Sequence, residues 1–141
     1  NRRDFLLSSC KACAAAGTGL LLSSLLSGCS SLQVYKTTPS ANVIDVPKSA
    51  FLPDEHRKLI RAAGVGYDII LIAPAGQTPY AILLRCSHQD NALVALNNGF
   101  SCNMHGSRFS ETGEVLTGPA TAPLKKFTVE QTEQSYLIKL I

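Results

Sequence analysis

Residues 67–85 carry the stretch that decides the fold class, and they read YDIILIA, PAGQTP and YAILLR in succession. The two outer runs are short, nearly continuous in apolar residues and bounded by turn formers, as buried β-strands are. The inner segment holds two prolines and a glycine, which end strands and favour turns. Residues 67–73 and 80–85 are therefore predicted to form a hairpin that is buried on both faces.

A second hairpin is predicted at the C-terminal end, where residues 126–130 and 136–141 flank a polar turn. Residues 43–46 alternate between apolar and polar side chains and add a further strand-like pattern. The one helix that we expect is a turn or two at residues 53–57, and residues 59–61 equally fit a strand. The predicted fold class is all-β: a small antiparallel β-sandwich or barrel that carries a loop-rich insertion.

The insertion, residues 86–125, has little periodicity, and a long irregular stretch inside a compact domain is usually functional. It contains the motifs CSH at residues 86–88 and CNMH at residues 102–105. No cysteine other than these two follows Cys29. Four residues that can bind a metal, arranged as two loop-borne Cys/His pairs, predict a metal site.

Three kinds of site fit these motifs. A disulfide between Cys86 and Cys102 would leave both histidines unexplained. A structural zinc site is a stronger alternative, although zinc motifs usually pair cysteine with cysteine and histidine with histidine. A mixed pair on each of two loops fits a [2Fe–2S] cluster better, because two thiolates can bind one iron and two imidazoles the other.

The two motifs resemble the Rieske family, whose pattern is C-x-H, a spacer and then C-x-x-H-G-S. Here thirteen residues separate the motifs, and Gly106 and Ser107 complete the second one. The similarity continues through Gly113-Glu114-Val115 and Gly118-Pro119-Ala120 and covers residues 42–141. It implies a Rieske-type antiparallel β-sandwich with a cluster-binding part at about residues 86–125. It also implies one [2Fe–2S] cluster per chain, with the ligands Cys86, Cys102, His88 and His105.

Two departures from the family pattern concern the surroundings of the cluster. Family members of high potential, linked to quinol oxidation, carry a disulfide between the two ligand loops, whereas this chain has Met104 and no cysteine in residues 89–101. Those members also place a tyrosine where this chain has Phe109. Ser107 remains and is expected to donate a hydrogen bond to a bridging sulfide. The resemblance therefore implies a reduction potential below the high end of the family.

The N-terminal segment resembles a twin-arginine export signal that ends in a lipobox. Arg2 and Arg3 precede an uncharged apolar stretch at residues 12–26, and Leu26-Ser27-Gly28-Cys29 follows. We expect residues 1–28 to be a signal that is removed together with Cys10 and Cys13, Cys29 to be acylated, and residues 29–41 to form a flexible tether. A core helix or an uncleaved anchor are alternatives, although about 15 apolar residues fall short of the ~20 that span a bilayer.

The expected function is one-electron transfer in a bacterial, periplasm-facing redox system that is lipid-anchored to a membrane, as a subunit of a quinol-oxidising respiratory complex. Cytochrome b or c type subunits and quinol are the expected partners, and the chain is expected to be an electron-transfer component rather than an enzyme on its own. A net charge of +3 and 6% aromatic residues without tryptophan argue against nucleic-acid binding. The alternatives are a free-standing Rieske ferredoxin that serves an oxygenase or oxidase, and a structural zinc module. His56 is expected to be a solvated surface residue.

Overall fold

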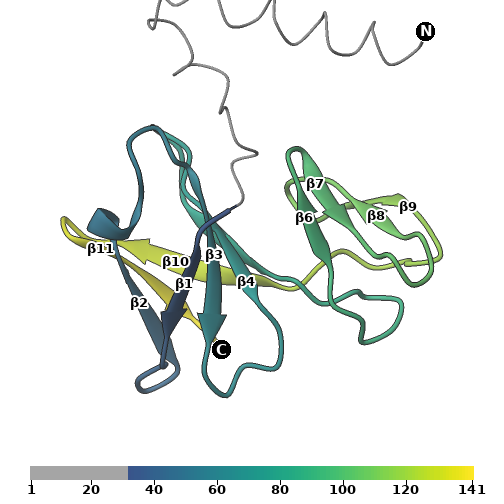
Figure 1. The fold of residues 1–141 in the computed structure, drawn as a ribbon, viewed down its shortest axis with the longest axis horizontal. Coiled ribbons are helices and arrows are strands. Elements are labelled where there is room, and N and C mark those ends of the chain that lie inside the picture. Colours follow the sequence, from purple (N-terminus) through teal and green to yellow (C-terminus); the bar gives the residue numbers. More distant parts are fainter. Residues whose placement is uncertain (1–31) are drawn as a thin grey trace, which may run out of the picture. The chain divides into compact units, whose positions relative to one another are not determined.

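The structure is a computed structural model that describes residues 32–141. The expected signal, its cysteines Cys10 and Cys13, and Cys29 lie outside the described residues. Within residues 32–141 the secondary structure consists of eleven strands, which form two sheets, and one short 3-10 helix (Figure 1). None of the helices in this range is long and apolar enough to cross a membrane. The predicted all-β class is confirmed.

The larger sheet has seven strands in the order β1-β3-β4-β5-β10-β11-β2. All neighbouring strands run antiparallel except β1 and β3, which are parallel. Both predicted hairpins are confirmed, as β4–β5 and β10–β11, and the pairing of β5 with β10 joins them. The strands are β1 (Val34–Thr37), β2 (Val43–Pro47), β3 (Arg57–Ala62), β4 (Ile69–Ile72), β5 (Tyr80–Leu83), β10 (Lys126–Gln131) and β11 (Ser135–Lys139).

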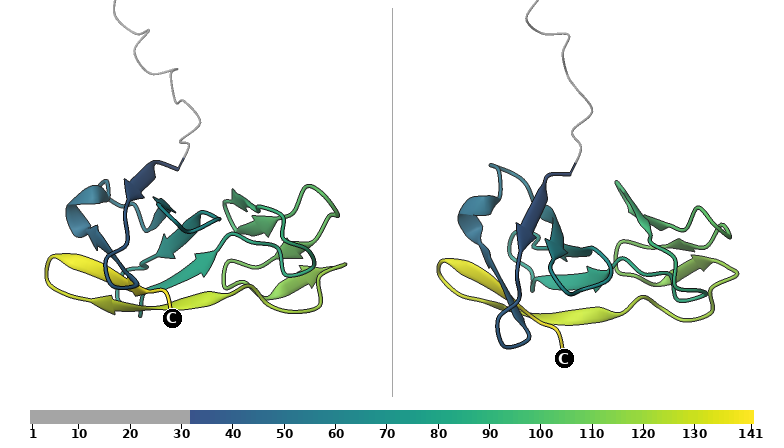
Figure 2. Two further views of the ribbon diagram at one scale, coloured as in Figure 1. Left: turned by 90° about the horizontal axis from the view of Figure 1, so that it is seen from below. Right: turned by 60° about the horizontal axis from the view of Figure 1, so that its bottom comes forward.

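The smaller sheet lies within the segment for which only loops were expected. Its four strands follow chain order and are β6 (Val94–Leu96), β7 (Gly99–Ser101), β8 (Arg108–Phe109) and β9 (Val115–Thr117). Figure 2 shows this sheet beside the larger one, with the cluster of connecting loops around it. Strands of two or three residues are too short to produce a periodic pattern, so they could not be predicted from the sequence.

Gly99 makes the close approach of β7 and β8 possible. It has a φ of 146°, and a Cβ at this position would lie 2.2 Å from the carbonyl oxygen of Phe109. Glycine is the residue that tolerates both the positive φ and the contact.

Two segments differ from the predictions. Residues 34–37, assigned to the flexible tether, form β1, because Val34–Thr37 pair in register with residues 59–62 of β3. The helix expected at residues 53–57 was wrong: Asp54 has a φ of 64°, which a right-handed helix does not allow. The only helical turn in the described range is the 3-10 helix η1 (Lys48–Ala50), and residues 59–61 belong to strand β3.

The two hydrophobic cores lie on opposite sides of β4. Ile69 and Leu71 point into the core of the larger sheet, whereas Ile70 and Ile72 point into a second core. Since side chains alternate along a strand, this division explains why the run is apolar at every position. The second core also contains Cys86 and Cys102, so it supports the candidate site. It includes Ile82, Leu84, Leu93, Phe100, Phe109, Ala120 and Leu124.

Candidate metal centre

Three connecting segments bring the candidate ligands together. Loop 1 (residues 86–91) follows β5, loop 2 (residues 102–107) follows β7, and loop 3 (residues 118–123) follows β9. Loop 1 is closed by a hydrogen bond of 2.8 Å from the amide of Cys86 to the carbonyl of Asn91. Loop 2 is closed by a bond of 3.0 Å from the amide of Gly106 to the carbonyl of Cys102. The backbone therefore fixes both cysteine-bearing loops at their bases.

The two cysteines form the buried half of the site. Both thiols are free, and Cys86 and Cys102 are 1% and 0% exposed. Burial raises the pKa of the Cys102 thiol, but the amides of His105 and Met104 and the side chain of Cys86 outweigh it, so that the pKa of Cys102 lies below its ordinary value. A site that favours the thiolate is suited to metal binding, because the thiolate is the form that ligates.

The two histidines form the exposed half of the site. The rings of His88 and His105 are exposed, with centroids 5.1 Å apart and planes at 86°. Across residues 32–141, no three cysteine, histidine, aspartate or glutamate side chains converge on a position for one metal ion. The four candidate ligands thus group two by two, cysteine with cysteine and histidine with histidine. A tetrahedral zinc site would instead bring all four around one point.

Ser107 is buried beneath the loops and links two of them. Its side chain is 0% exposed, and its Oγ accepts a hydrogen bond of 3.0 Å from the amide of Ala120 in loop 3. Because the hydroxyl is the acceptor in this bond, its proton stays free to donate to a further group. Phe109, two residues later in the chain, is 1% exposed and has no hydroxyl to add a second donor.

Ser87 is a residue of the site that the sequence analysis missed. Its Oγ donates a hydrogen bond of 2.5 Å to the carbonyl of Ala122 in loop 3. Its position between Cys86 and His88 was the only sequence signal, and that position says nothing about a partner 35 residues away. Loop 3 is therefore bonded to loop 1 through Ser87 and to loop 2 through Ser107.

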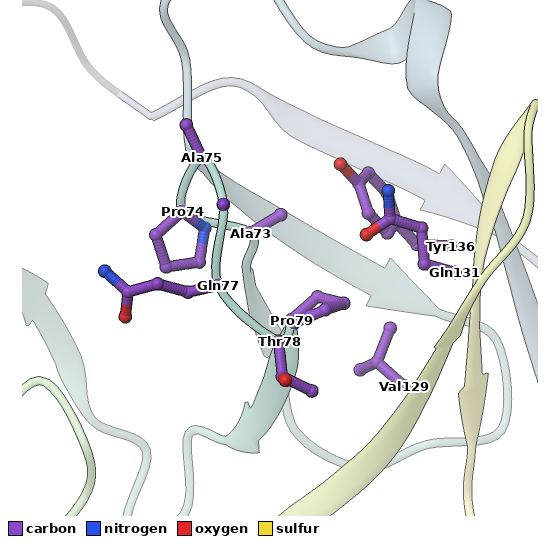
Figure 3. Close-up of a pocket in the computed structure, with 10 residues that line it drawn as sticks. Ala73, Pro74, Ala75, Gln77, Thr78, Pro79, Val129, Gln131 and Tyr136 are labelled. Atoms are coloured by element: carbon purple, nitrogen blue, oxygen red, sulfur yellow. The ribbon is translucent and has the colours of Figure 1, made fainter.

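His56, the third histidine considered in the sequence, lies outside loops 1 to 3, just before β3, and is exposed as expected. A cavity of about 530 Å³ lies in the larger sheet at the β4–β5 turn and is lined in part by Pro74, Tyr136 and Gln131 (Figure 3). None of the candidate ligands lines it.

Comparison with known proteins identifies the family. The family model described as "Rieske [2Fe-2S] domain" matches residues 42–128, which is more than half of the chain. The chain belongs to the Rieske family. It accordingly carries a Rieske-type [2Fe–2S] cluster and works by electron transfer through it. The paired side chains fit such a cluster, because two free, buried thiols meet on one side and two imidazoles on the other.

A curated relative and several solved structures are similar to this Rieske protein. The cytochrome b6-f complex iron-sulfur subunit of Chlorobaculum thiosulfatiphilum is 26% identical over 67% of the chain, and the chain spans about half (52%) of that relative. The plasma membrane Rieske protein PetC3 of Synechocystis PCC 6803 is similar with a TM-score of 0.55 and 24% identity, over 68% of this chain and 98% of that one. A chain in a complex of reduced oxygenase and oxidised ferredoxin of carbazole 1,9a-dioxygenase gives 0.53 and 20%, over 72% and 95%. These structures confirm the Rieske-type β fold.

Proposed function

We propose that Cys86 and Cys102 hold one iron of the cluster and that His88 and His105 hold the other. The observation that carries this assignment is the grouping of the side chains into a buried thiol pair and an exposed imidazole pair. A Rieske cluster needs this division, with two thiolates on one iron and two imidazoles on the other. Ser107 belongs to the same site as a hydrogen-bond donor, because its proton is free and its Oγ is held in place by Ala120.

The cluster supplies one-electron chemistry when it is bound, and the protein residues determine how it is reached. The thiol side is closed to water by the second hydrophobic core. The imidazole side is exposed, so an electron partner approaches His88 and His105. Each imidazole can hold a proton on the ring nitrogen that faces away from the metal, which links electron uptake to proton uptake. Neutral imidazole ligands also raise the potential above that of an all-cysteine cluster, into a range of roughly −150 to +300 mV.

Electron paramagnetic resonance of the reduced protein tests the ligand assignment. The wild-type protein is expected to give a signal with the low average g value of a Rieske cluster. His88→Ala and His105→Ala are expected to lose that signal, whereas His56→Ala, an exposed histidine outside the loops, is expected to keep it. A variant that retains the wild-type spectrum without His88 or His105 would exclude that residue as a ligand.

The cellular setting that we propose is a periplasm-facing, membrane-associated redox system, with the chain as a subunit of a quinol-oxidising respiratory complex. In this proposal residues 1–28 are a twin-arginine signal, Cys29 is acylated, and residues 42–141 are the redox domain. The similarity to a cytochrome b6-f complex subunit supports cytochrome b or c type partners, and quinol is part of the same proposal. Cys29→Ser is expected to move the protein from the membrane fraction to the soluble periplasmic fraction. Membrane retention of that variant would exclude acylation of Cys29 as the sole anchor.

A free-standing ferredoxin that serves an oxygenase or oxidase is the second candidate. Two observations favour it: Cys86 and Cys102 are the only cysteines in the described loops and neither forms a disulfide, and Phe109 offers no hydroxyl. Affinity purification from detergent-solubilised membranes separates the two candidates. A cytochrome b that co-purifies supports the respiratory complex, and an oxygenase component in its place supports the ferredoxin.

A further inference from the structure

Three residues outside the ligand set meet at the base of loop 1. The hydroxyl of Tyr67 donates a hydrogen bond of 2.6 Å to the carbonyl oxygen of Asp90. The guanidinium of Arg85 lies over the Tyr67 ring, 5.8 Å from its centroid. The same guanidinium donates from Nε and Nη2 to Oδ1 of Asp90, at 2.8 and 2.5 Å. Tyr67, Arg85 and Asp90 therefore each contact the other two residues.

The positions of these residues in the chain give the contacts their meaning. Arg85 immediately precedes Cys86, and Asp90 lies two residues after His88. The two residues that flank the ligand-bearing segment 86–89 therefore both contact Tyr67: Arg85 lies over its ring and Asp90 accepts from its hydroxyl. That segment has no disulfide to brace it, because both cysteines of the described chain are free.

Tyr67 itself stands on a rigid support. Its neighbour Asp68 accepts a backbone hydrogen bond of 2.8 Å from the amide of Leu84, which continues the pairing of β4 with β5 toward loop 1. The carboxylate of Asp68 also binds Arg61 through two hydrogen bonds, of 2.8 and 2.6 Å. The tyrosine therefore extends from the larger sheet to the loop, and its sequence separation from Asp90 is 23 residues.

We propose that Tyr67 is a positioning residue for Cys86 and His88, which clamps the two ends of loop 1 against the larger sheet. This inference rests on the proposed ligand assignment. The ion pair between Arg85 and Asp90 is exposed, and such pairs contribute little by themselves. Tyr67 is half-buried as a residue, and its hydroxyl supplies a directional bond to the backbone of the loop, where a shift would move the ligands that the loop carries.

The test compares Tyr67→Phe with Tyr80→Phe in the cluster-loaded, full-length protein. Tyr67→Phe keeps the ring under Arg85 and removes only the hydroxyl. Tyr80 is a half-buried tyrosine of β5 whose hydroxyl has no hydrogen-bond partner within residues 32–141, so Tyr80→Phe is the matched control. Two quantities are measured: the half-life of the visible cluster absorbance with an iron chelator, and the line width of the EPR spectrum after reduction. Melting of the apoprotein, followed by circular dichroism, reports the stability of the fold separately.

Tyr67→Phe is expected to shorten the cluster half-life about fivefold, the loss that corresponds to one ordinary hydrogen bond, and to broaden the EPR lines because the ligand geometry becomes less uniform. The apoprotein melting temperature and the Tyr80→Phe control are expected to match the wild type. A half-life and line width equal to the wild type would overturn the proposal, as would a fall in the melting temperature that accounts for the whole effect.

A second variant covers the case in which Tyr67→Phe does not fold. Arg85→Gln removes the cation that lies over the Tyr67 ring, a contact that stabilises the clamp in addition to the exposed ion pair, and is expected to give the same two changes in a weaker form. If Arg85→Gln leaves both quantities unchanged, the clamp is refuted. Absence of a Rieske signal in the wild-type protein would instead contradict the proposed function, so the two failures are distinguishable.

Discussion

Replacement of Ser107 by alanine tests the role of its hydroxyl in the potential of the cluster. The hydroxyl accepts from the amide of Ala120 at 3.0 Å in a fully buried position, and its proton is not used in that bond. A hydrogen bond to a charged acceptor is worth about 1.5–3 kcal/mol. The potential depends only on how much stronger this hydrogen bond is in the reduced cluster than in the oxidised cluster. If that difference is about 1 kcal/mol, the midpoint potential of Ser107→Ala is lower than that of the wild type by about 40 mV, since 59 mV corresponds to a tenfold change in a one-electron equilibrium.

Protein-film voltammetry at pH 7 measures this shift, and Ser110→Ala provides the control. Ser110 lies in the turn between β8 and β9, outside loops 1 to 3, and its Oγ bonds Thr112 and the amide of Glu114. Its replacement is expected to leave the midpoint unchanged. Ser107→Ala also leaves the Ala120 amide without its partner, which is expected to destabilise the fold by about 1–3 kcal/mol. A midpoint that stays constant or rises while the fold loses this stability would show that Ser107 supports loop 3 but donates nothing to the cluster.

Three further substitutions test other contacts of the site. Phe109→Tyr adds a hydroxyl beside the ligand loops, and the midpoint is expected to rise by some tens of millivolts in voltammetry if that hydroxyl reaches a ligand sulfur; no rise would mean that it does not. Ser87→Ala removes the hydrogen bond of 2.5 Å to the carbonyl of Ala122, and cluster loss in the presence of an iron chelator is expected to become several-fold faster. Ser87→Thr keeps a hydroxyl and is expected to lose the cluster at the wild-type rate. Gly99→Ala places a Cβ 2.2 Å from the Phe109 carbonyl and requires a positive φ, so chemical denaturation is expected to show a loss of several kcal/mol; an unchanged midpoint of denaturation would show that β7 and β8 can separate without cost.

The parts of the fold that could be predicted are those in which a run of apolar residues is long enough to show a pattern. The apolar run of residues 69–72 predicted a strand buried on both faces, and the structure divides it between two cores. The motifs CSH and CNMH predicted a site, and the structure brings their cysteines together as a buried pair and their histidines together as an exposed pair. The short strands β6 to β9 could not be predicted, because two or three residues hold no periodic signal. The helix expected at residues 53–57 failed for a local reason, the positive φ of Asp54, which depends on the turn formed with Leu52 and Glu55.

The hydrogen bonds of loop 3 give a physical reason why the ligand loops need no disulfide between them. Ser87 attaches loop 1 to the carbonyl of Ala122, and Ser107 attaches loop 2 to the amide of Ala120, so two bonds within three residues of loop 3 connect the ligand loops indirectly. Ala120 and Leu124 are buried in the second core, which anchors loop 3 to the larger sheet. A covalent bridge would tie the loops only to each other, whereas this arrangement ties both to the core. Hydrogen bonds of about 1 kcal/mol each can open where a disulfide cannot. It follows that the cohesion of the site depends on the core beneath it, and that core substitutions at Leu124 should release the cluster before the larger sheet unfolds.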